Sequence, residues 1–141
     1  MFDLATKLGR LTKKLLKSEY FIWLTTVDST GTPQPRPVWF IWENDTVFIF
    51  SQSKAHKLRH IQKNPNVSLH FNTADEKGET RVVILTGVAT IDEQAIPANK
   101  NRAYLRKYKS GITELNSTPA QFSREYSSAI RITPTNLRGW E

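Results

Sequence analysis

Residues 34–42 read Gln-Pro-Arg-Pro-Val-Trp-Phe-Ile-Trp, and this stretch decides the fold class. Its last five residues are all apolar, so an extended strand here has two apolar faces instead of one. Residues 80–91 are apolar on both faces in the same way. One set of side chains can fill a small barrel, and helices or another chain must cover the other set. We therefore predict a homodimer built on these two strands.

The first half of the same stretch is rich in proline, with Pro35 and Pro37 following Pro33. Proline cannot donate to a β ladder and is confined to edge strands and bulges. The strand is therefore predicted to begin at a sheet edge, and a proline-broken edge strand with core aromatics is its plainest interpretation.

Around this stretch, apolar and β-branched residues repeat with period two between short turn sequences. The pattern predicts six strands, over 20–27, 34–42, 46–51, 66–72, 80–91 and 122–133. It predicts helices over 2–17, 54–63 and 98–109, leaves 112–121 unassigned and makes 134–141 a tail. Few helices among short strands indicate a mainly β fold, an antiparallel β-barrel with helices at its ends. A chain of 141 residues is expected to form one domain, residues 1–141.

Two single residues refine this assignment. Asp3 is expected at the start of the first helix, as its N-cap or as an acid in its first turn. Gly87 interrupts the longest strand and predicts a bulge or a close backbone approach there.

The composition limits the classes of partner. The net charge of +7 indicates attraction to an anionic group such as a phosphate-bearing cofactor, nucleic acid or a membrane surface. Because the basic residues concentrate in the predicted helices and not among strand aromatics, nucleic acid is not expected. The longest apolar runs have strand length and the N-terminus lacks a signal-peptide pattern, so we expect a cytoplasmic protein without a membrane partner.

Residues 51–59, Ser-Gln-Ser-Lys-Ala-His-Lys-Leu-Arg, are the most informative local stretch for chemistry. They lead from the end of a strand into the start of a helix, where backbone amides, hydroxyls and cations can converge on an anion. The alternative is that Ser53 only caps the helix and the basic side chains are solvated. The candidate anion ligands are Ser51, Gln52, Ser53, Lys57 and Arg59.

Signs of protein-based catalysis or metal binding are weak. The chain has no cysteine, so thiolate sites and cysteine nucleophiles are excluded. His56 and His60 have metal-ligand spacing, but no carboxylate accompanies them and no metal is expected. No serine-nucleophile motif or paired-carboxylate pattern is present. If the protein is an enzyme, a cofactor is expected to carry the reactive atoms, and we name no catalytic residue.

The order and spacing of several short motifs add a family resemblance. The motifs are Gly31-Thr32-Pro33, Arg36-Pro37-Val38-Trp39-Phe40, Ser51, Lys57 with Arg59, Asn64-Pro65-x-Val67-Ser68-Leu69, Gly87-x-Ala89 and Arg131-Ile132-x-Pro134 through Gly139-Trp140. Together they resemble the flavin-binding split-barrel family related to pyridoxamine 5′-phosphate oxidase. The similarity is to the small single-domain branch, whose members bind FMN or the 5-deazaflavin coenzyme F-420.

The resemblance implies a six-stranded split barrel that dimerises, with two flavin sites at the subunit interface. It implies that Lys57 binds the cofactor phosphate with Arg59 nearby, and that the Ser51 hydroxyl contacts the cofactor. The strand from Arg36 to Trp39 would line the ring or the phosphoribityl chain, Arg81 or Val82 would approach from the partner, and Trp140 would cover the site. The residues expected to contact the cofactor are Arg36, Pro37, Val38, Trp39, Ser51, Gln52, Ser53, Lys57, Arg59, Arg81 and Trp140.

Two departures from the oxidase itself shape the functional prediction. His56 occupies the position before the phosphate-binding lysine at which that enzyme has an arginine. The C-terminal segment with which the oxidase binds pyridoxal phosphate is not recognisable in this chain. Pyridoxamine phosphate oxidation is therefore not expected. We expect an FMN-dependent oxidoreductase acting on an unidentified small molecule. The alternatives are a reductase dependent on the deazaflavin F-420 and a non-catalytic flavin-binding or redox-sensing protein.

Overall fold

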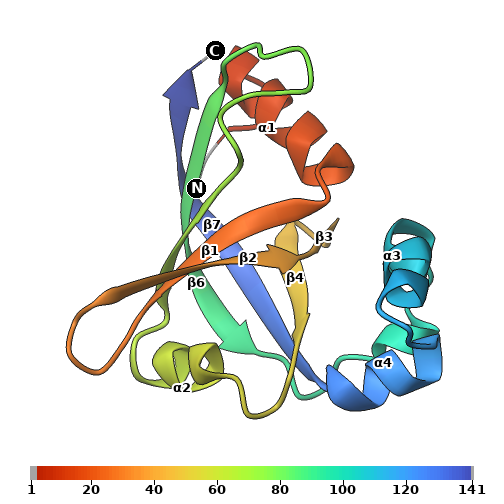
Figure 1. Cartoon of the computed structure of the whole chain (residues 1–141). Coiled ribbons are helices and arrows are strands. Elements are labelled where there is room, and N and C mark those ends of the chain that lie inside the picture. The colour runs from red at the N-terminus through yellow and green to blue at the C-terminus, as the bar shows by residue number, and fades with distance from the viewer. Residues whose placement is uncertain (1–2, 141) are drawn as a thin grey trace.

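The computed structural model describes residues 3–140, and they form a mainly β fold. The strands are β1 (Phe21–Val27), β2 (Pro33–Trp39), β3 (Ile41–Glu43), β4 (Thr46–Ser51), β5 (Asn66–His70), β6 (Val82–Ile91) and β7 (Ser128–Trp140). The helices are α1 (Lys7–Ser18), α2 (His56–Lys63), α3 (Arg102–Glu114) and α4 (Pro119–Glu125), with a 3₁₀ turn, η1 (Ala98–Lys100). Figure 1 shows β1 and β2 crossing the longer strands, with α3 and α4 together at the right of the view.

The strands form one antiparallel sheet in the order β2-β1-β5-β6-β7-β4-β3. Its two edge strands, β2 and β3, are consecutive in the chain and only Phe40 separates them. Since adjacent Cα atoms are about 3.8 Å apart, the opposite edges of the sheet must meet at this residue. The sheet is therefore curled into a half-barrel that is joined at Phe40 and open elsewhere between β2 and β3.

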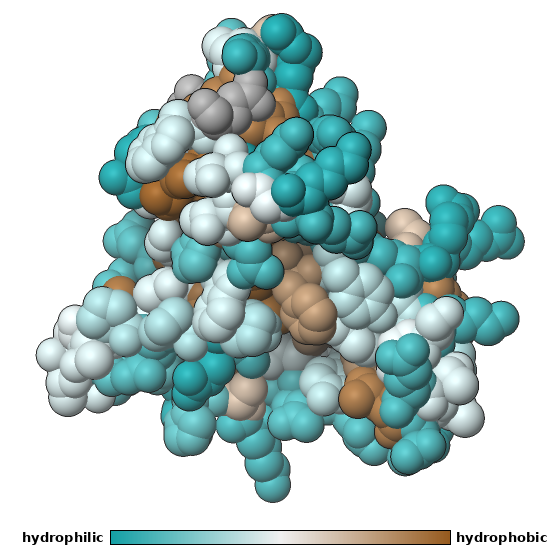
Figure 2. Space-filling view, turned by 45° about the horizontal axis from the view of Figure 1, so that its top comes forward, coloured by the Kyte–Doolittle hydropathy of each residue, from teal (hydrophilic) through white to brown (hydrophobic). Residues whose placement is uncertain are grey.

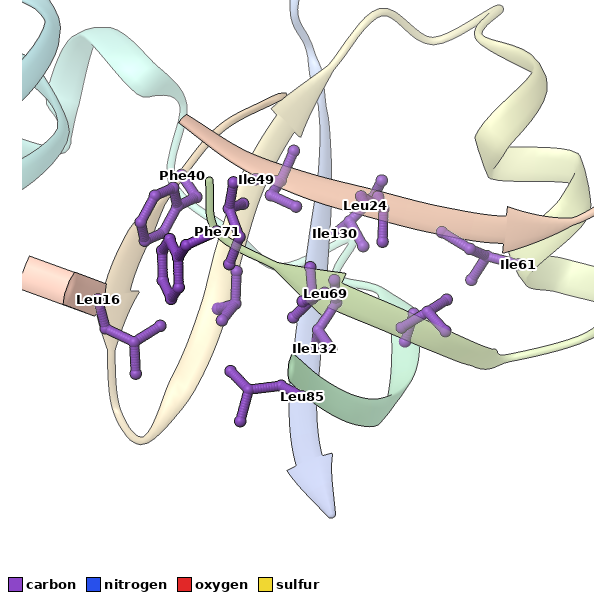
Figure 3. Packing of buried hydrophobic residues seen from close by; sticks show 14 of the residues in the cluster. Leu16, Leu24, Phe40, Ile49, Ile61, Leu69, Phe71, Leu85, Ile130 and Ile132 are labelled. Carbon is purple, nitrogen blue, oxygen red and sulfur yellow. The ribbon is translucent and has the colours of Figure 1, made fainter. Parts of the chain in front are cut away.

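Apolar side chains fill the inside of the curled sheet. Those labelled in Figure 3 point toward one another from strands on all sides, and α1 and α2 add Leu16 and Ile61. The largest of them, Phe40 and Phe71, are almost completely buried. This inner core fixes the register, because a shift by one residue would turn each strand's apolar set outward.

A second apolar cluster covers the outside of β4. Val47 and Ile49 point into the inner core, whereas Phe48 and Phe50 point away from it into the second cluster. The helices α3 and α4 close this cluster with residues such as Tyr104. Every residue of β4 is consequently buried.

The same helices also cover the second face of residues 34–42. Ile41 is 4% exposed within the α3–α4 cluster, and Trp39 packs against that cluster. The cover predicted for this stretch is thus provided by the chain itself. On β6 the situation differs, since Val83 is buried inside but Val88 on the other face is 38% exposed. Of the predicted dimer surface, the outward face of β6 therefore keeps an exposed apolar side chain, Val88, together with the partly buried Val82 and Ile84.

The prediction of six strands is wrong, because the structure has seven within residues 3–140. The predicted strand 34–42 is divided at Phe40 into β2 and β3, where the chain passes from one sheet edge to the other. The edge position predicted from the prolines is confirmed for β2.

The predicted strand 122–133 is also wrong in its first part. Residues 119–125 form the helix α4. Its N-cap Thr118 accepts a hydrogen bond from the Gln121 N–H, and Pro119 lies in its first turn. Phe122 of this helix is buried. The strand begins at Ser128 and continues through the predicted tail to Trp140.

A bulge explains how this last strand tolerates Pro134. The pairing of β6 with β7 shifts register between Thr86 and Gly87, and Gly87 lies opposite Pro134. A Cβ atom on Gly87 would lie 2.6 Å from the Thr133 carbonyl oxygen, so only glycine fits. β4 pairs with β7 only as far as Ile132, so no strand on that side needs an N–H from Pro134. The bulge predicted at Gly87 is confirmed.

The first two helices begin later than predicted. The N-cap of α1 is Thr6, whose Oγ1 accepts a hydrogen bond of 2.9 Å from the Gly9 N–H, and not Asp3. Phe2, in the predicted range, lies outside the described residues. The N-cap of α2 is Ala55, which makes no side-chain capping bond, so the capping role considered for Ser53 is wrong.

Candidate functional site

A cavity of about 480 Å³ opens between β2, the end of β4, the turn into α2, and the helices α3 and α4. We call it the Trp39 cavity. Six of the predicted cofactor contacts line it: Pro37, Val38, Trp39, Ser51, Gln52 and Lys57. Figure 2 shows apolar side chains reaching the surface at the middle of the face it draws, among hydrophilic projections.

The polar end of the Trp39 cavity is cationic. Lys57, in the first turn of α2, is half-buried, and burial lowers the pKa of its ammonium group. The nearby guanidinium of Arg36 on β2 lowers that pKa further by charge repulsion. None of the described residues that line the cavity is acidic. Arg36 is exposed and does not itself line the cavity, but two cations that repel each other favour a bound anion between them.

Ser51 and Gln52 complete this end where β4 stops. Ser51 is 2% exposed, and its hydroxyl donates to the Gln52 carbonyl oxygen at 3.1 Å. Gln52 is exposed and lies between Ser51 and the start of α2. The hydroxyl and the side-chain amide are neutral hydrogen-bonding groups that can supplement the cations.

Much of the remaining lining of the cavity is aromatic, and Trp39 is held in this wall by stacking. Its ring lies 4.6 Å from that of Tyr108 with planes 10° apart, and 5.7 Å from that of Phe122. Gly111 makes this approach possible, since a Cβ atom there would lie 2.9 Å from Cη2 of Trp39. The stacked indole is a fixed wall for a flat ligand.

Sequence reasoning missed most of this aromatic wall. Beyond the predicted contacts, the cavity is lined by Phe21, Phe50, Ala55, Tyr104, Leu115, Phe122 and Tyr126. Phe122 lies in α4, and Leu115 and Tyr126 directly follow α3 and α4; these three residues come from stretches that were left unassigned or predicted as strand. The available signal was the helical spacing of Tyr104 and Tyr108, which marks one face of α3.

The backbone beside Trp39 is fixed by two side chains of α3. The Phe40 N–H donates to Tyr108 Oη at 2.8 Å, and Lys107 Nζ donates to the Phe40 carbonyl oxygen at 2.9 Å. The Lys107 ammonium also lies 3.8 Å from the centre of the Phe40 ring. Sequence reasoning assigned no role to Lys107 or Tyr108 at the site.

Two predicted anion ligands lie elsewhere, Ser53 in the turn before α2 and Arg59 on α2. Ser53 and Arg59 line a separate cavity of about 480 Å³ that also contains Glu93. The Arg59 Nη2 atom is 2.6 Å from Nδ1 of His56. The structure therefore separates Ser53 and Arg59 from the Lys57 end of the Trp39 cavity.

Two further predicted contacts also lie outside the Trp39 cavity of their own chain. Arg81 pairs with Glu19 at 2.5 Å, in a cavity between α1 and the loop before β6. Trp140 is 65% exposed at the end of β7, opposite Val82. The approach of Arg81 to the partner's cofactor and the covering role of Trp140 both stay predictions.

The histidines that have metal-ligand spacing do not converge. His56 contacts Arg59, whereas His60 Nδ1 lies 2.8 Å from Thr26 Oγ1. Among residues 3–140 no three side chains of histidine, aspartate or glutamate gather as a metal site would require. In the same part of the chain, none of the helices has the length and apolar character needed to cross a membrane.

Comparison with solved structures shows similar folds. A structure titled F420 Reductase is 25% identical, with 89% of this chain and 94% of that chain covered and a TM-score of 0.67. A conserved hypothetical protein from Mycobacterium tuberculosis is 18% identical, with coverage of 100% and 88% and a TM-score of 0.76. An FAD-binding protein from Mesorhizobium loti is 16% identical, with coverage of 93% and 90% and a TM-score of 0.65. The last two show the likeness of the fold alone.

The match to a protein-family model covers nearly the whole chain. Curated proteins gave no match. The family model described as Pyridoxamine 5'-phosphate oxidase matches residues 9–141, a range that contains every residue of the Trp39 cavity. The chain belongs to the pyridoxamine 5′-phosphate oxidase family.

Proposed function

We propose that this protein is an FMN-dependent oxidoreductase that acts on a small molecule. The observation that carries the proposal is the Trp39 cavity, in which a cationic end and an aromatic wall stand side by side. FMN has the matching chemistry, since an anionic phosphate is joined to a flat, largely apolar ring system. The cavity thus fits the group that the family implies.

Each part of the cavity has a role in this proposal. Lys57 and Arg36 bind the phosphate through charge, and bound phosphate relieves the repulsion that lowers the Lys57 pKa. Val38 and Trp39 orient the ring and exclude water from one side of it. The flavin supplies the hydride-transfer chemistry, so the protein needs no nucleophile of its own.

The proposal includes a homodimer with the cofactor in the interface. The outward side chains of β6 that are apolar, namely the partly buried Val82 and Ile84 and the exposed Val88, support this arrangement. Arg81 and Trp140 lie away from the Trp39 cavity of their own chain, and a partner would bring its copies of them to the cofactor.

The deazaflavin F-420 is the second candidate cofactor. The F420 Reductase similarity, at 25% identity over 89% of this chain, favours it. The basic helix α1, with Lys13 and Lys17 exposed, suits an anionic oligoglutamate tail. The same anion-and-ring chemistry of the Trp39 cavity serves either cofactor.

Mass spectrometry of the ligand released from natively purified protein tests the proposal and separates the two cofactors. We expect FMN or F-420. If none is retained, each is added to the ligand-free protein, and the one that belongs should raise Tm. A protein that retains neither and responds to neither contradicts the proposal.

Catalysis is separated from storage or sensing by the redox cycle of the bound cofactor. Reduction by NAD(P)H followed by reoxidation with candidate small-molecule acceptors is expected for an oxidoreductase. A bound cofactor that stays inert in both half-reactions favours the non-catalytic flavin-binding or redox-sensing alternative.

A further inference from the structure

A second cavity lies beside α2 and takes no part in the proposed binding of the flavin. It has a volume of about 480 Å³ and lies between α2 and the last residues of β6. Small-molecule sites in proteins typically enclose about 300–1,000 Å³, so the volume suits a ligand of nucleotide size. We call it the Arg59 cavity, after the arginine that lines it.

The lining of the Arg59 cavity includes apolar surface. Ala55 before α2 and Ile91 of β6 are half-buried and both line it, together with Leu58 of α2, which is 7% exposed. Apolar surface of this kind can pack against one face of a flat ring such as a nucleobase. The cavity is therefore suited to more than a bare anion.

The exposed residues that line the Arg59 cavity bring two cations and one carboxylate to it. The cations are Lys54 and Arg59, and the carboxylate is Glu93. One guanidinium nitrogen of Arg59, Nη2, lies 2.6 Å from Nδ1 of His56. A guanidinium has five N–H donors, so further donors remain for an anion. A fully anionic chain would be repelled by Glu93, whereas a ligand that joins one anionic group to hydroxyl donors suits both kinds of charge.

A single tight turn separates the Arg59 cavity from the Trp39 cavity. The Ala55 N–H donates to the Gln52 carbonyl oxygen at 3.1 Å and closes a turn over residues 52–55. Gln52 lines the Trp39 cavity, Ser53 and Lys54 line the Arg59 cavity, and Ala55 lines both. The Cα atoms at the two ends of such a turn are less than about 7 Å apart. One extended ligand could therefore occupy both cavities, or two ligands could lie side by side.

We propose that the Arg59 cavity binds a nucleoside 5′-phosphate group. Arg59 and Lys54 bind its phosphate, the apolar surface at Ile91 packs against its base, and Glu93 accepts hydrogen bonds from its ribose hydroxyls. This inference goes beyond the proposed function, since it concerns a different cavity. The group can come from two sources. It is either the adenosine half of a flavin dinucleotide whose flavin half lies in the Trp39 cavity, or part of a separate nucleotide.

Titrations of the ¹⁵N-labelled full chain, followed by ¹H–¹⁵N NMR, report both the affinity and the place of binding. The probes are AMP, adenosine and pyrophosphate, which carries more charge than AMP but no nucleoside. We expect AMP to bind about 10-fold more tightly than either of the others. The amide signals of Ser53, Lys54 and Thr90 should shift, and the indole N–H of Trp39 should not. Pyrophosphate that binds as tightly as AMP would reveal only a cationic patch and overturn the inference.

Arg59→Met tests the role of the arginine. We expect it to weaken AMP binding about 10-fold, to the affinity of adenosine. The matched control is Arg106→Met, which removes an exposed arginine of α3 that lines neither cavity and should bind AMP as the wild type does. Both side chains are exposed, so both variants should fold normally. An Arg59→Met variant with wild-type affinity for AMP overturns the inference.

FMN and FAD distinguish the two sources of the nucleotide. If FAD binds the wild type about 10-fold more tightly than FMN, and Arg59→Met removes this difference, the site belongs to a flavin dinucleotide. If FAD and FMN bind equally and AMP still binds the FMN-saturated protein, the site belongs to a separate nucleotide. Either result supports the inference.

Two further outcomes separate this inference from the proposed function. If FMN and F-420 fail to bind while AMP binding persists and depends on Arg59, the cofactor proposal fails and the nucleotide site stands. If Lys57→Ala abolishes AMP binding and Arg59→Met leaves it unchanged, AMP occupies the Trp39 cavity and the inference is overturned.

Discussion

The hydroxyl of Tyr108 holds the backbone of Phe40, the single residue that joins the two edges of the sheet. Tyr108 Oη accepts the Phe40 N–H at 2.8 Å and lies 2.7 Å from the Tyr20 carbonyl oxygen, to which it can donate. At Phe40 the chain leaves β2 and enters β3, so no neighbouring strand pairs with this peptide. Tyr108 of α3 thus provides the hydrogen bond that a neighbouring strand would otherwise make with the Phe40 N–H, and its ring stacks on Trp39.

Tyr108→Phe should therefore destabilise the protein and loosen the site. Removal of the hydroxyl leaves the buried Phe40 N–H unpaired, and we expect a loss of about 1–3 kcal/mol in the free energy of unfolding. Urea denaturation measures it. Tyr126→Phe, which removes a hydroxyl from a partly buried ring of the same cluster, is the control and should change stability by less than about 1 kcal/mol. Equal effects of both variants would deny the role of Tyr108.

Lys107 should make stability depend on pH. Burial lowers its pKa to about 8, while the charge of Glu19 acts in the opposite direction. The folded-state pKa lies below the unfolded value, so between pH 8 and 10 the unfolded chain binds more protons. The free energy of unfolding then rises with pH, by up to about 1 kcal/mol per pH unit from this group.

The test is the difference in slope between the wild type and Lys107→Met, which cannot titrate. Lys57 contributes a slope of the same sign, because its pKa is lowered by burial and by Arg36, and it is present in both proteins. The raised pKa of buried Tyr104 acts in the opposite sense above pH 10, outside the window. Parallel stability curves from pH 8 to 10 would show that Lys107 titrates normally.

Gly111→Ala should displace Trp39 although alanine favours helices over glycine by about 1 kcal/mol. The new Cβ atom would meet the Tyr20 hydroxyl and lie 2.9 Å from the indole ring of Trp39. We expect an altered near-ultraviolet circular dichroism spectrum and about 10-fold weaker FMN binding. Ser110→Ala, at the exposed neighbouring position, should leave both unchanged. An unaltered spectrum with full FMN affinity for Gly111→Ala would mean that the Trp39 wall is adaptable.

Val88→Arg should separate the proposed dimer. The substitution places a charge on the outward face of β6, where Val88 is 38% exposed in the single chain. Light scattering should find a dimeric wild type and a monomeric variant with weakened FMN binding. Ile96→Arg, at an apolar side chain 56% exposed outside the strands, should remain dimeric. A wild type that is monomeric at micromolar concentration refutes the dimer.

The parts of the fold that could be predicted from the sequence are those that local sequence patterns determine. Alternation predicted the strands that form most of the sheet, and the prolines predicted the edge position of β2. The break at Phe40 could not be predicted. It arises because the edge strands β2 and β3 meet there, and no local sequence pattern relates the two edges of a sheet. In the last strand, Pro134 appeared to end the pairing, but the Gly87 bulge and the end of β4 accommodate it.

The site divides in the same way. Ser51 and Lys57 were readable because the end of a strand and the start of a helix stand close in the sequence. Tyr104 and Phe122 were not, since they reach the cavity by the packing of α3 and α4 on β4. The aromatic residue Phe122 suggested a strand, while the helix signals Thr118 and Pro119 stood just before it.

The most direct test of the central claim is the affinity of the ligand-free protein for FMN, measured by isothermal titration calorimetry for three proteins. Lys57→Ala removes the cation of the Trp39 cavity, whereas Lys54→Ala removes an exposed lysine of the same segment that lies on the other cavity. The account predicts a loss of about 10-fold or more for Lys57→Ala, as for a charge-assisted hydrogen bond, and wild-type affinity for Lys54→Ala. Equal affinities of all three proteins would contradict it.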